Sequence, residues 1–146
     1  ETFSNSLKIK NTKITLSKSV ENSIATINEF TVRKVFENLI DNAIGYSDAG
    51  SEVFVDVSGT ASTLTIRVSD KGIGIPESDK DSIFQQFYRA RNAVAKKNVG
   101  TGLGLFISKS IVDGHGGRIW FESKENVGTT FFVQIPRGNQ GLATSQ

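Results

Sequence analysis

Residues 30–46 read FTVRKVFENLIDNAIGY, and apolar side chains recur in this stretch at three- and four-residue spacing. That spacing places them on one side of an α-helix, in which about 3.6 residues make one turn. The recurring residues are Val32, Val35, Phe36, Leu39, Ile40 and Ala43. The sequence therefore predicts a helix from Phe30 to about Tyr46 with one buried face.

Short segments on both sides of this helix alternate apolar and polar residues. Alternation with a period of two is typical of a β-strand with one buried face. The predicted strands cover residues 14–17, 23–27, 53–57, 64–68, 119–122 and 129–135. The strands at 53–57 and 64–68 are close enough in sequence to form a hairpin.

Two further helices are predicted after the hairpin. One covers residues 79–89, and the other covers residues 103–112 and ends at Asp113-Gly114, a typical helix C-terminus. The second has Leu103, Phe106, Ile107, Ser110 and Ile111 on one side. The pattern indicates one α+β domain, with helices on one face of a mostly antiparallel sheet.

Three polar segments have little to bury. Residues 1–13 are expected to be a frayed linker, residues 90–99 a mobile loop, and residues 137–146 a disordered tail. The folded domain is therefore expected to cover residues 14–136.

The composition excludes several kinds of site. The chain of 146 residues has no cysteine and one histidine, His115, which excludes disulfides, thiolate nucleophiles and metal sites with two imidazoles. A formal charge of +2 is too small to indicate nucleic acid or an anionic membrane. No apolar run approaches the roughly 20 residues that cross a bilayer. His115 follows a helix end and is expected to cap it.

Asn38 and Asn42 lie four residues apart on the first predicted helix and share one strip at the margin of its apolar face. Their amide oxygens are neutral ligands that suit Mg²⁺, which takes one or two protein ligands and fills its remaining positions with water and phosphate. The alternative is that both asparagines are merely solvated.

Asp70 ends a predicted strand and opens the loop Asp70-Lys-Gly-Ile-Gly-Ile-Pro76. An ionised carboxylate only accepts hydrogen bonds, so in a pocket it selects an amine, such as the 6-amino group of adenine, over a carbonyl. Gly72 and Gly74 would let the backbone approach a flat ring. The alternative is a plain turn, in which this pattern is common.

Two further motifs lie between this loop and the last helix. Gly100-Thr-Gly-Leu-Gly-Leu105 leads into a helix, where glycines and free N–H groups make a phosphate cradle or, alternatively, a flexible linker. Phe84-Gln-Gln-Phe-Tyr-Arg89 combines two aromatic anchors with a cation suited to phosphate, although core packing also explains it.

In the order in which they follow one another along the chain, with Gly128-Thr129 opening the last predicted strand, the motifs resemble the catalytic, ATP-binding domain of sensor histidine kinases, within the GHKL or Bergerat-fold ATPases. The resemblance covers residues 14–136 and implies a two-layer sandwich, with about three helices on one face of a mixed, mostly antiparallel five-stranded sheet. It implies ATP and Mg²⁺ as ligands and phosphotransfer to histidine as the activity.

The resemblance also implies roles for individual residues. Asn42 would bind Mg²⁺, and Asn38 would support phosphates or metal as a catalytic residue. Asp70 would bond the adenine amine, and Arg89 would face the γ-phosphate. The other implied nucleotide contacts are Tyr46, Gly72, Gly74, Ile75, Gly100, Thr101, Gly102, Leu103, Gly104, Leu105 and Thr129. Residues 90–99 would be the ATP lid.

Two positions bear on activity. The family usually has a lysine three residues after the metal asparagine, where this chain has Gly45, so triphosphate affinity is expected to be weaker unless Lys96 or Lys97 substitutes. Hydrolysing relatives carry a glutamate at the place of Asn38, and an amide is no general base. Phosphotransfer to histidine therefore fits better than hydrolysis.

The expected partners are a histidine-bearing dimerisation domain of the same kinase and a response regulator. Without that histidine domain the chain is expected to be inactive, monomeric and cytoplasmic, with no nucleic acid and no direct membrane contact. A degenerate nucleotide-binding module without phosphotransfer, or another branch of the superfamily, remains an alternative.

Overall fold

A computed structural model describes the backbone of residues 2–9, 12–20, 25–26, 29–48, 50–90 and 103–139. Side chains are described for residues 30, 32–48, 50–90 and 103–137. The elements are β1 (Thr2–Ile9), β2 (Thr12–Val20), β3 (Ala25–Thr26), α1 (Glu29–Tyr46), β4 (Glu52–Gly59), β5 (Thr63–Asp70), the 3₁₀ helix η1 (Glu77–Asp79), α3 (Gly104–Gly114), β6 (Arg118–Lys124), β7 (Gly128–Pro136) and β8 (Gly138–Asn139).

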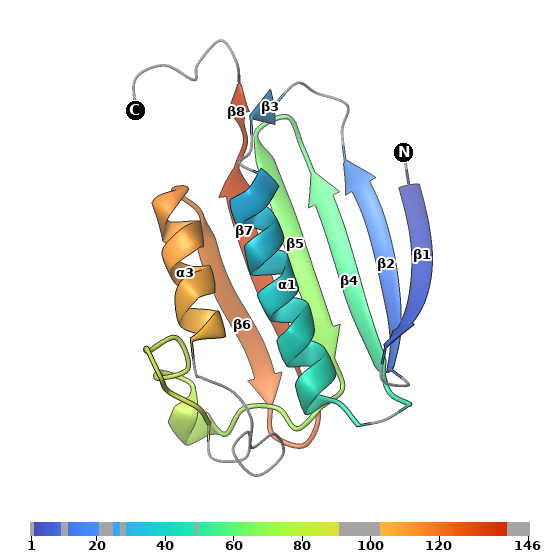
Figure 1. Ribbon diagram of the computed structural model, residues 1–146, viewed down its shortest axis with the longest axis vertical. Coiled ribbons are helices and arrows are strands. Elements are labelled where there is room, and N and C mark those ends of the chain that lie inside the picture. The colour runs from blue at the N-terminus through green and yellow to red at the C-terminus, as the bar shows by residue number, and fades with distance from the viewer. Residues whose placement is uncertain are drawn as a thin grey trace.

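Six strands form the main sheet in the order β1-β2-β4-β5-β7-β6. Among the strands that the structure describes, only β2 and β4 pair in parallel, and the chain between them contains β3 and α1. The two α-helices of the described residues lie on one face of this sheet, where α1 packs against β5 and α3 against β6 (Figure 1). The predicted α+β class with a mixed, mostly antiparallel sheet is confirmed, but the sheet has six strands where five were expected.

The additional strand is β1, which pairs with β2 from Thr2↔Ser19 to Ile9↔Thr12. The prediction of a frayed linker over residues 1–13 is therefore wrong. Edge strands pair on one side only, so a polar sequence such as TFSNSLKI is tolerated there. Likewise, Gly138–Asn139 pairs with β3, so the tail predicted over residues 137–146 is ordered at its start; its remainder lies outside the described residues.

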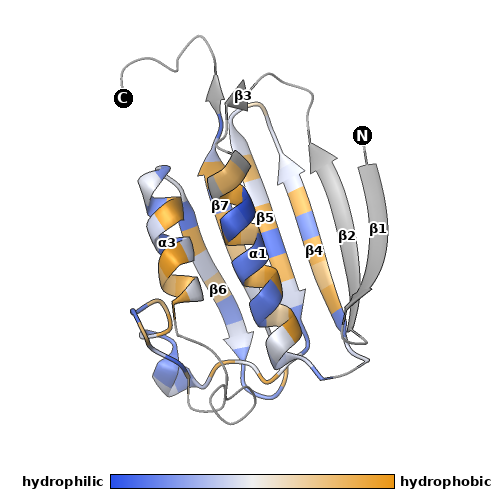
Figure 2. Cartoon of the chain, viewed as in Figure 1, coloured by the Kyte–Doolittle hydropathy of each residue, from blue (hydrophilic) through white to orange (hydrophobic). Residues whose placement is uncertain are grey.

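The core lies between the helices and the sheet. Val35, Leu39 and Ala43 of α1 are buried, and Val32, Phe36 and Ile40 pack against the same core, which confirms the predicted apolar face. Hydrophobic and hydrophilic residues alternate along β5, whereas β4 shows a longer hydrophobic stretch (Figure 2). Within the described part of the chain, neither α-helix has the length and apolar content needed to cross a membrane.

The helix predicted over residues 79–89 is wrong. Only Glu77–Asp79 is helical, and it is followed by turns with hydrogen bonds such as Gln85 N–H to Ser82 O and Tyr88 N–H to Gln85 O. Phe87 then adopts a positive φ of 64°. The spacing of the aromatic residues suggested one buried side of a helix. Phe84 is instead positioned by the turns and packs edge-on against Phe121 and Phe131.

Helix α3 buries a different face from the predicted one. Ser108 and Val112 are fully buried, whereas Ser110 is exposed. Ser108 faces α1 because its hydroxyl accepts a hydrogen bond from the Asn38 amide. His115 does cap this helix, since its backbone N–H donates to the carbonyls of Ile111 and Val112.

Candidate functional site

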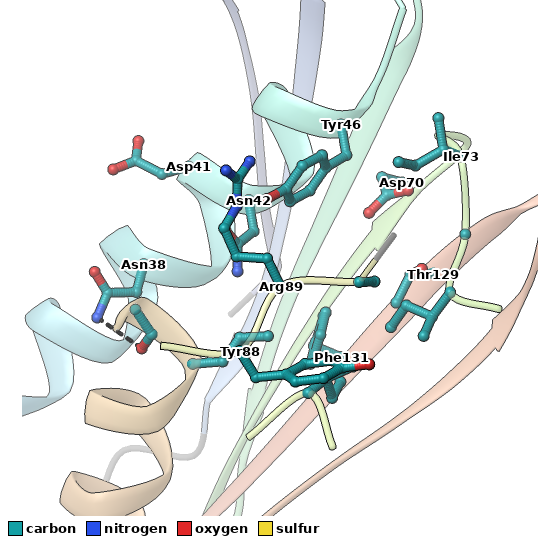
Figure 3. A pocket seen from close by; sticks show the side chains of 16 residues that line it. Asn38, Asp41, Asn42, Tyr46, Asp70, Ile73, Tyr88, Arg89, Thr129 and Phe131 are labelled. Carbon is teal, nitrogen blue, oxygen red and sulfur yellow. Dashed lines mark hydrogen bonds between the residues drawn. The ribbon is translucent and has the colours of Figure 1, made fainter. Parts of the chain in front are cut away.

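A cavity of about 280 Å³ opens between α1, the loop after β5, strand β7 and the start of α3. Asp70 and Thr129 lie at one end of it, and Asn38 lies at the other (Figure 3). The lining residues are Asn38, Asp41, Asn42, Tyr46, Asp70, Ile73, Gly74, Ile75, Ile83, Tyr88, Arg89, Ala90, Gly104, Leu105, Thr129 and Phe131. The motifs that are separate in the sequence therefore meet in one space.

Asp70 is positioned by the end of β5, where it pairs with Thr129 of β7. Its carboxylate accepts the backbone N–H of Gly72 at 2.8 Å and that of Thr129, so its orientation is fixed by the backbone. Burial raises its pKa to about 6, although both hydrogen bonds favour the charged form and lower it. At neutral pH Asp70 is therefore a fixed, ionised acceptor inside a cavity.

The glycines after Asp70 are needed for contacts within the protein. A Cβ at Gly72 would lie 2.3 Å from the Tyr46 carbonyl oxygen. Gly74 has a φ of +67°, and a Cβ there would lie 2.1 Å from the carbonyl oxygen of Lys124. Both glycines therefore let the loop pack against α1 and the β6–β7 turn. Only Gly74 of the two lines the cavity, so the expectation that both admit a flat ring applies to Gly74 at most.

Asn38 and Asn42 both line the cavity. The Asn38 amide nitrogen donates to Gly104 O and to Ser108 Oγ, each at 3.3 Å, which joins α1 to α3 and orients the amide. Asp41 adds a carboxylate to the same end of the cavity. Oxygen atoms of this kind fit Mg²⁺, which prefers hard oxygen ligands.

Comparison with known proteins identifies the family. The family model described as histidine kinase-, DNA gyrase B-, and HSP90-like ATPase matches residues 27–139. The chain belongs to this ATPase family. The cavity and its ligand-type residues all lie within the matched range.

Relatives of this ATPase domain are sensor kinases. The chain is 42% identical over 132 residues to the sensor protein kinase WalK of Staphylococcus saprophyticus, covering 89% of this chain and 22% of that protein. WalK of Staphylococcus aureus is 48% identical over 105 residues, covering 70% of this chain and 25% of that protein. The chain thus spans about a quarter or less of the curated relatives it matches.

Solved structures agree on the fold of the ATPase domain. The mycobacterial sensor histidine kinase MprB aligns with a TM-score of 0.72 at 25% identity, covering 87% of this chain and 86% of that one. The catalytic domain of histidine kinase ThkA aligns with a TM-score of 0.70 at 28% identity, covering 89% and 83%. The Bergerat-type architecture expected from the sequence is therefore confirmed.

The structure places most of the predicted site residues of the ATPase domain at the cavity. Ten of them line it, namely Asn38, Asn42, Tyr46, Asp70, Gly74, Ile75, Arg89, Gly104, Leu105 and Thr129. Gly72 and Leu103 do not line it. Of the lid predicted over residues 90–99, only Ala90 is described, and it is buried and lines the cavity. The rest of the lid, with Lys96 and Lys97, lies outside the described residues, as do Gly100, Thr101 and Gly102.

Sequence reasoning missed several lining residues, among them Asp41, Tyr88 and Phe131. Asp41 could have been found, because it is next to Asn42 on the helix. Tyr88 could not, because its hydroxyl donates to the buried carboxylate of Asp79 after a series of turns. Of the two predicted aromatic anchors, Phe84 is packed as expected beneath the cavity, but Phe87 is 66% exposed and is no anchor.

Burial of Asp70 predicts a dependence of stability on pH. The folded chain holds the Asp70 proton up to about pH 6, whereas the unfolded chain releases it near the ordinary aspartate pKa of 3.8. The free energy of unfolding should therefore fall as pH rises from about 4 to about 6, by up to about 3 kcal/mol from this group. Urea unfolding across this range measures it, and Asp70→Asn should lack this component; identical pH profiles for both proteins would contradict it.

Proposed function

We propose that this domain binds ATP together with Mg²⁺ and transfers the γ-phosphate to a histidine on a dimerisation hairpin of the same sensor kinase. The observation that carries the proposal is the partly buried, ionised acceptor Asp70 at one end of a cavity that is also lined by the amides of Asn38 and Asn42. Family membership and the sensor-kinase relatives support it.

Recognition of the base would fall to Asp70, which accepts from the 6-amino group of adenine. GTP carries a carbonyl at that place, and two facing acceptors repel each other. Tyr46 and Ile75 would pack on the ring, and Thr129 would contact its polar edge. Specificity for adenine would thus come from a carboxylate whose orientation the backbone of β7 and of Gly72 already fixes.

The phosphates would extend toward α1 and α3. Asn42 would hold Mg²⁺, with Asn38 beside it, and the ion would neutralise phosphate charge. Arg89 would bind the γ-phosphate, since its guanidinium extends toward α1 across the cavity (Figure 3). Gly104 and Leu105, at the start of α3, would lie beside the phosphates, near the backbone N–H groups that a helix N-terminus offers to anions.

Transfer to histidine needs little acid–base chemistry. A neutral imidazole already has a lone pair, so positioning and charge neutralisation supply most of the catalysis. Asn38 stands where a hydrolase needs a base, and its amide nitrogen donates to α3, which leaves the amide oxygen for the metal or phosphates. We therefore favour phosphotransfer over hydrolysis, followed by transfer to a response regulator in a cytoplasmic two-component pathway.

The binding test compares ATP with GTP, each with and without Mg²⁺, by calorimetric titration. We expect Mg²⁺-dependent binding of ATP and at least about tenfold weaker binding of GTP, since a lost hydrogen bond and a facing carbonyl together cost more than about 1.4 kcal/mol. Equal binding of both nucleotides would contradict the role of Asp70.

A degenerate module that binds nucleotide without transfer is the second candidate, and Gly45 favours it because glycine supplies no charge to phosphate. Mixing the domain with labelled Mg·ATP and the isolated histidine hairpin of a WalK relative separates the two. Label on the hairpin supports the kinase, and binding without label supports the degenerate module. Label on His115 would contradict its capping role, in which Nδ1 contacts Ile111 O.

A further inference from the structure

Ser123, near the end of β6, lies behind the cavity wall and contacts three groups through its hydroxyl. The backbone N–H of Ile75 donates to Ser123 Oγ at 2.8 Å. Ser123 Oγ is also 3.0 Å from the carbonyl oxygen of Gly128 and 2.7 Å from Thr129 Oγ1. Ile75 and Thr129 line the cavity and Ser123 does not, so any effect of Ser123 on a ligand acts through them.

The three contacts fix the direction of each proton. A serine hydroxyl has one proton to donate and two lone pairs to accept with. One lone pair takes the Ile75 N–H, and the carbonyl of Gly128 can only accept, so it takes the single proton of Ser123. All three bonds are satisfied only if Thr129 donates its own hydroxyl proton to Ser123.

We propose that Ser123 is a positioning residue that fixes the Thr129 hydroxyl as a hydrogen-bond acceptor toward the cavity. The inference rests on the proposed function, because the ligand it concerns is the purine of ATP. With its proton committed to Ser123, Thr129 presents only lone pairs, as the ionised Asp70 beside it does. The end of the cavity then holds two acceptors and selects a base whose edge carries an amine.

The backbone around Ser123 is held from a second side. The ammonium group of Lys80 donates to the Ser123 carbonyl oxygen at 2.8 Å and pairs with Glu77 at 2.8 Å. The N–H of Asn126, in the β6–β7 turn, donates to Ile73 O at 2.6 Å. Ser123 is thus tied to the loop after β5, to η1 and to β7, so its hydroxyl has a defined place.

The test measures dissociation constants of Mg·ATP and Mg·ITP, whose hypoxanthine carries a carbonyl at the position of the adenine amine. In Ser123→Ala the Thr129 hydroxyl is free to turn and donate to that carbonyl. We expect ITP to bind more tightly than it does to the unaltered chain, and the preference for ATP to fall about fivefold to tenfold, the value of one hydrogen bond. If the substitution only loosened the loop, both nucleotides would bind more weakly and the affinity for ITP would not rise.

Three variants complete the experiment. Ser123→Thr keeps the hydroxyl and should keep the preference for ATP. Ser69→Ala is the matched control, because Ser69 of the neighbouring strand β5 bonds Thr130, the next residue of β7, at 2.8 Å. Ser123→Cys fills the site with a weak donor and should reduce the preference about threefold; it replaces the alanine variant if that one does not fold.

The outcomes distinguish a failure of the proposed function from a failure of the role of Ser123 alone. If the unaltered chain shows no preference for ATP over ITP, the proposed function and this inference both fail. If it has that preference and a folded Ser123→Ala or Ser123→Cys retains it within twofold, only the role of Ser123 is overturned. A gain in ITP affinity confined to these two variants supports the inference.

Discussion

Asp70→Asn should lower ATP affinity about 100-fold at pH 7.5 while leaving the fold as stable as before or more stable. The affinity falls because a charge-assisted hydrogen bond is lost and the asparagine amide turns a donor toward the adenine amine, which together cost about 2–4 kcal/mol. Stability holds because the substitution removes a partly buried charge that the fold disfavours, as its raised pKa of about 6 indicates. Calorimetric titration and thermal unfolding of the same samples measure both effects.

The matched control is Asp81→Asn, which makes the same chemical change at an exposed aspartate outside the cavity. Both measurements should stay at the values of the unaltered chain. Loss of ATP affinity accompanied by a large loss of stability in Asp70→Asn would mean that the carboxylate is chiefly structural, as a cap for the N–H groups of Gly72 and Thr129.

Gly74→Ala should destabilise the domain by about 3 kcal/mol or more and abolish ATP binding. Two costs combine: a positive φ of 67°, which costs an L-residue about 1–2 kcal/mol, and a methyl group placed 2.1 Å from the Lys124 carbonyl oxygen. Because that carbonyl is backbone, the whole loop has to move away from the β6–β7 turn. Denaturant unfolding and nucleotide titration at one temperature measure the two losses.

Gly116→Ala separates the two costs. Gly116 has a φ of +72°, but a Cβ there meets nothing within 4 Å. This variant should therefore lose only the conformational term, about 1–2 kcal/mol, and keep its ATP affinity. Equal losses of stability at the two glycines would show that contact with Lys124 is relieved at little cost.

The sequence predicted the structure best where a periodic pattern was long, or where the chemistry of one side chain suits one kind of contact. The helix over residues 30–46 followed from six apolar positions, and Asp70 followed from a carboxylate at the end of an alternating strand. The expectation that Asp70 and Thr129 meet came from the family resemblance, and their pairing across β5 and β7 places them together. These features depend on local periodicity or on a motif.

The predictions that failed depend on contacts between distant segments. The expected helix at 79–89 is replaced by turns because Phe84 packs against β6 and β7, and no local pattern reports that packing. Strand β1 was missed because an edge strand needs only a neighbour to pair with, which local composition does not show. Ser123 gave no signal at all, since its importance comes from three partners in two other segments.

The pairing of Asp70 with Thr129 joins segments that lie far apart in the chain. Bringing the two segments together costs chain entropy before the contact between them stabilises the fold. Folding is therefore slower than it would be for contacts between neighbouring segments. A folding intermediate that contains β4, β5 and α1 but not yet β7 would have Asp70 in place but would lack Thr129, the other residue at that end of the cavity. Nucleotide added during refolding should therefore leave the early kinetic phases unchanged and slow only unfolding, because it recognises the finished sheet.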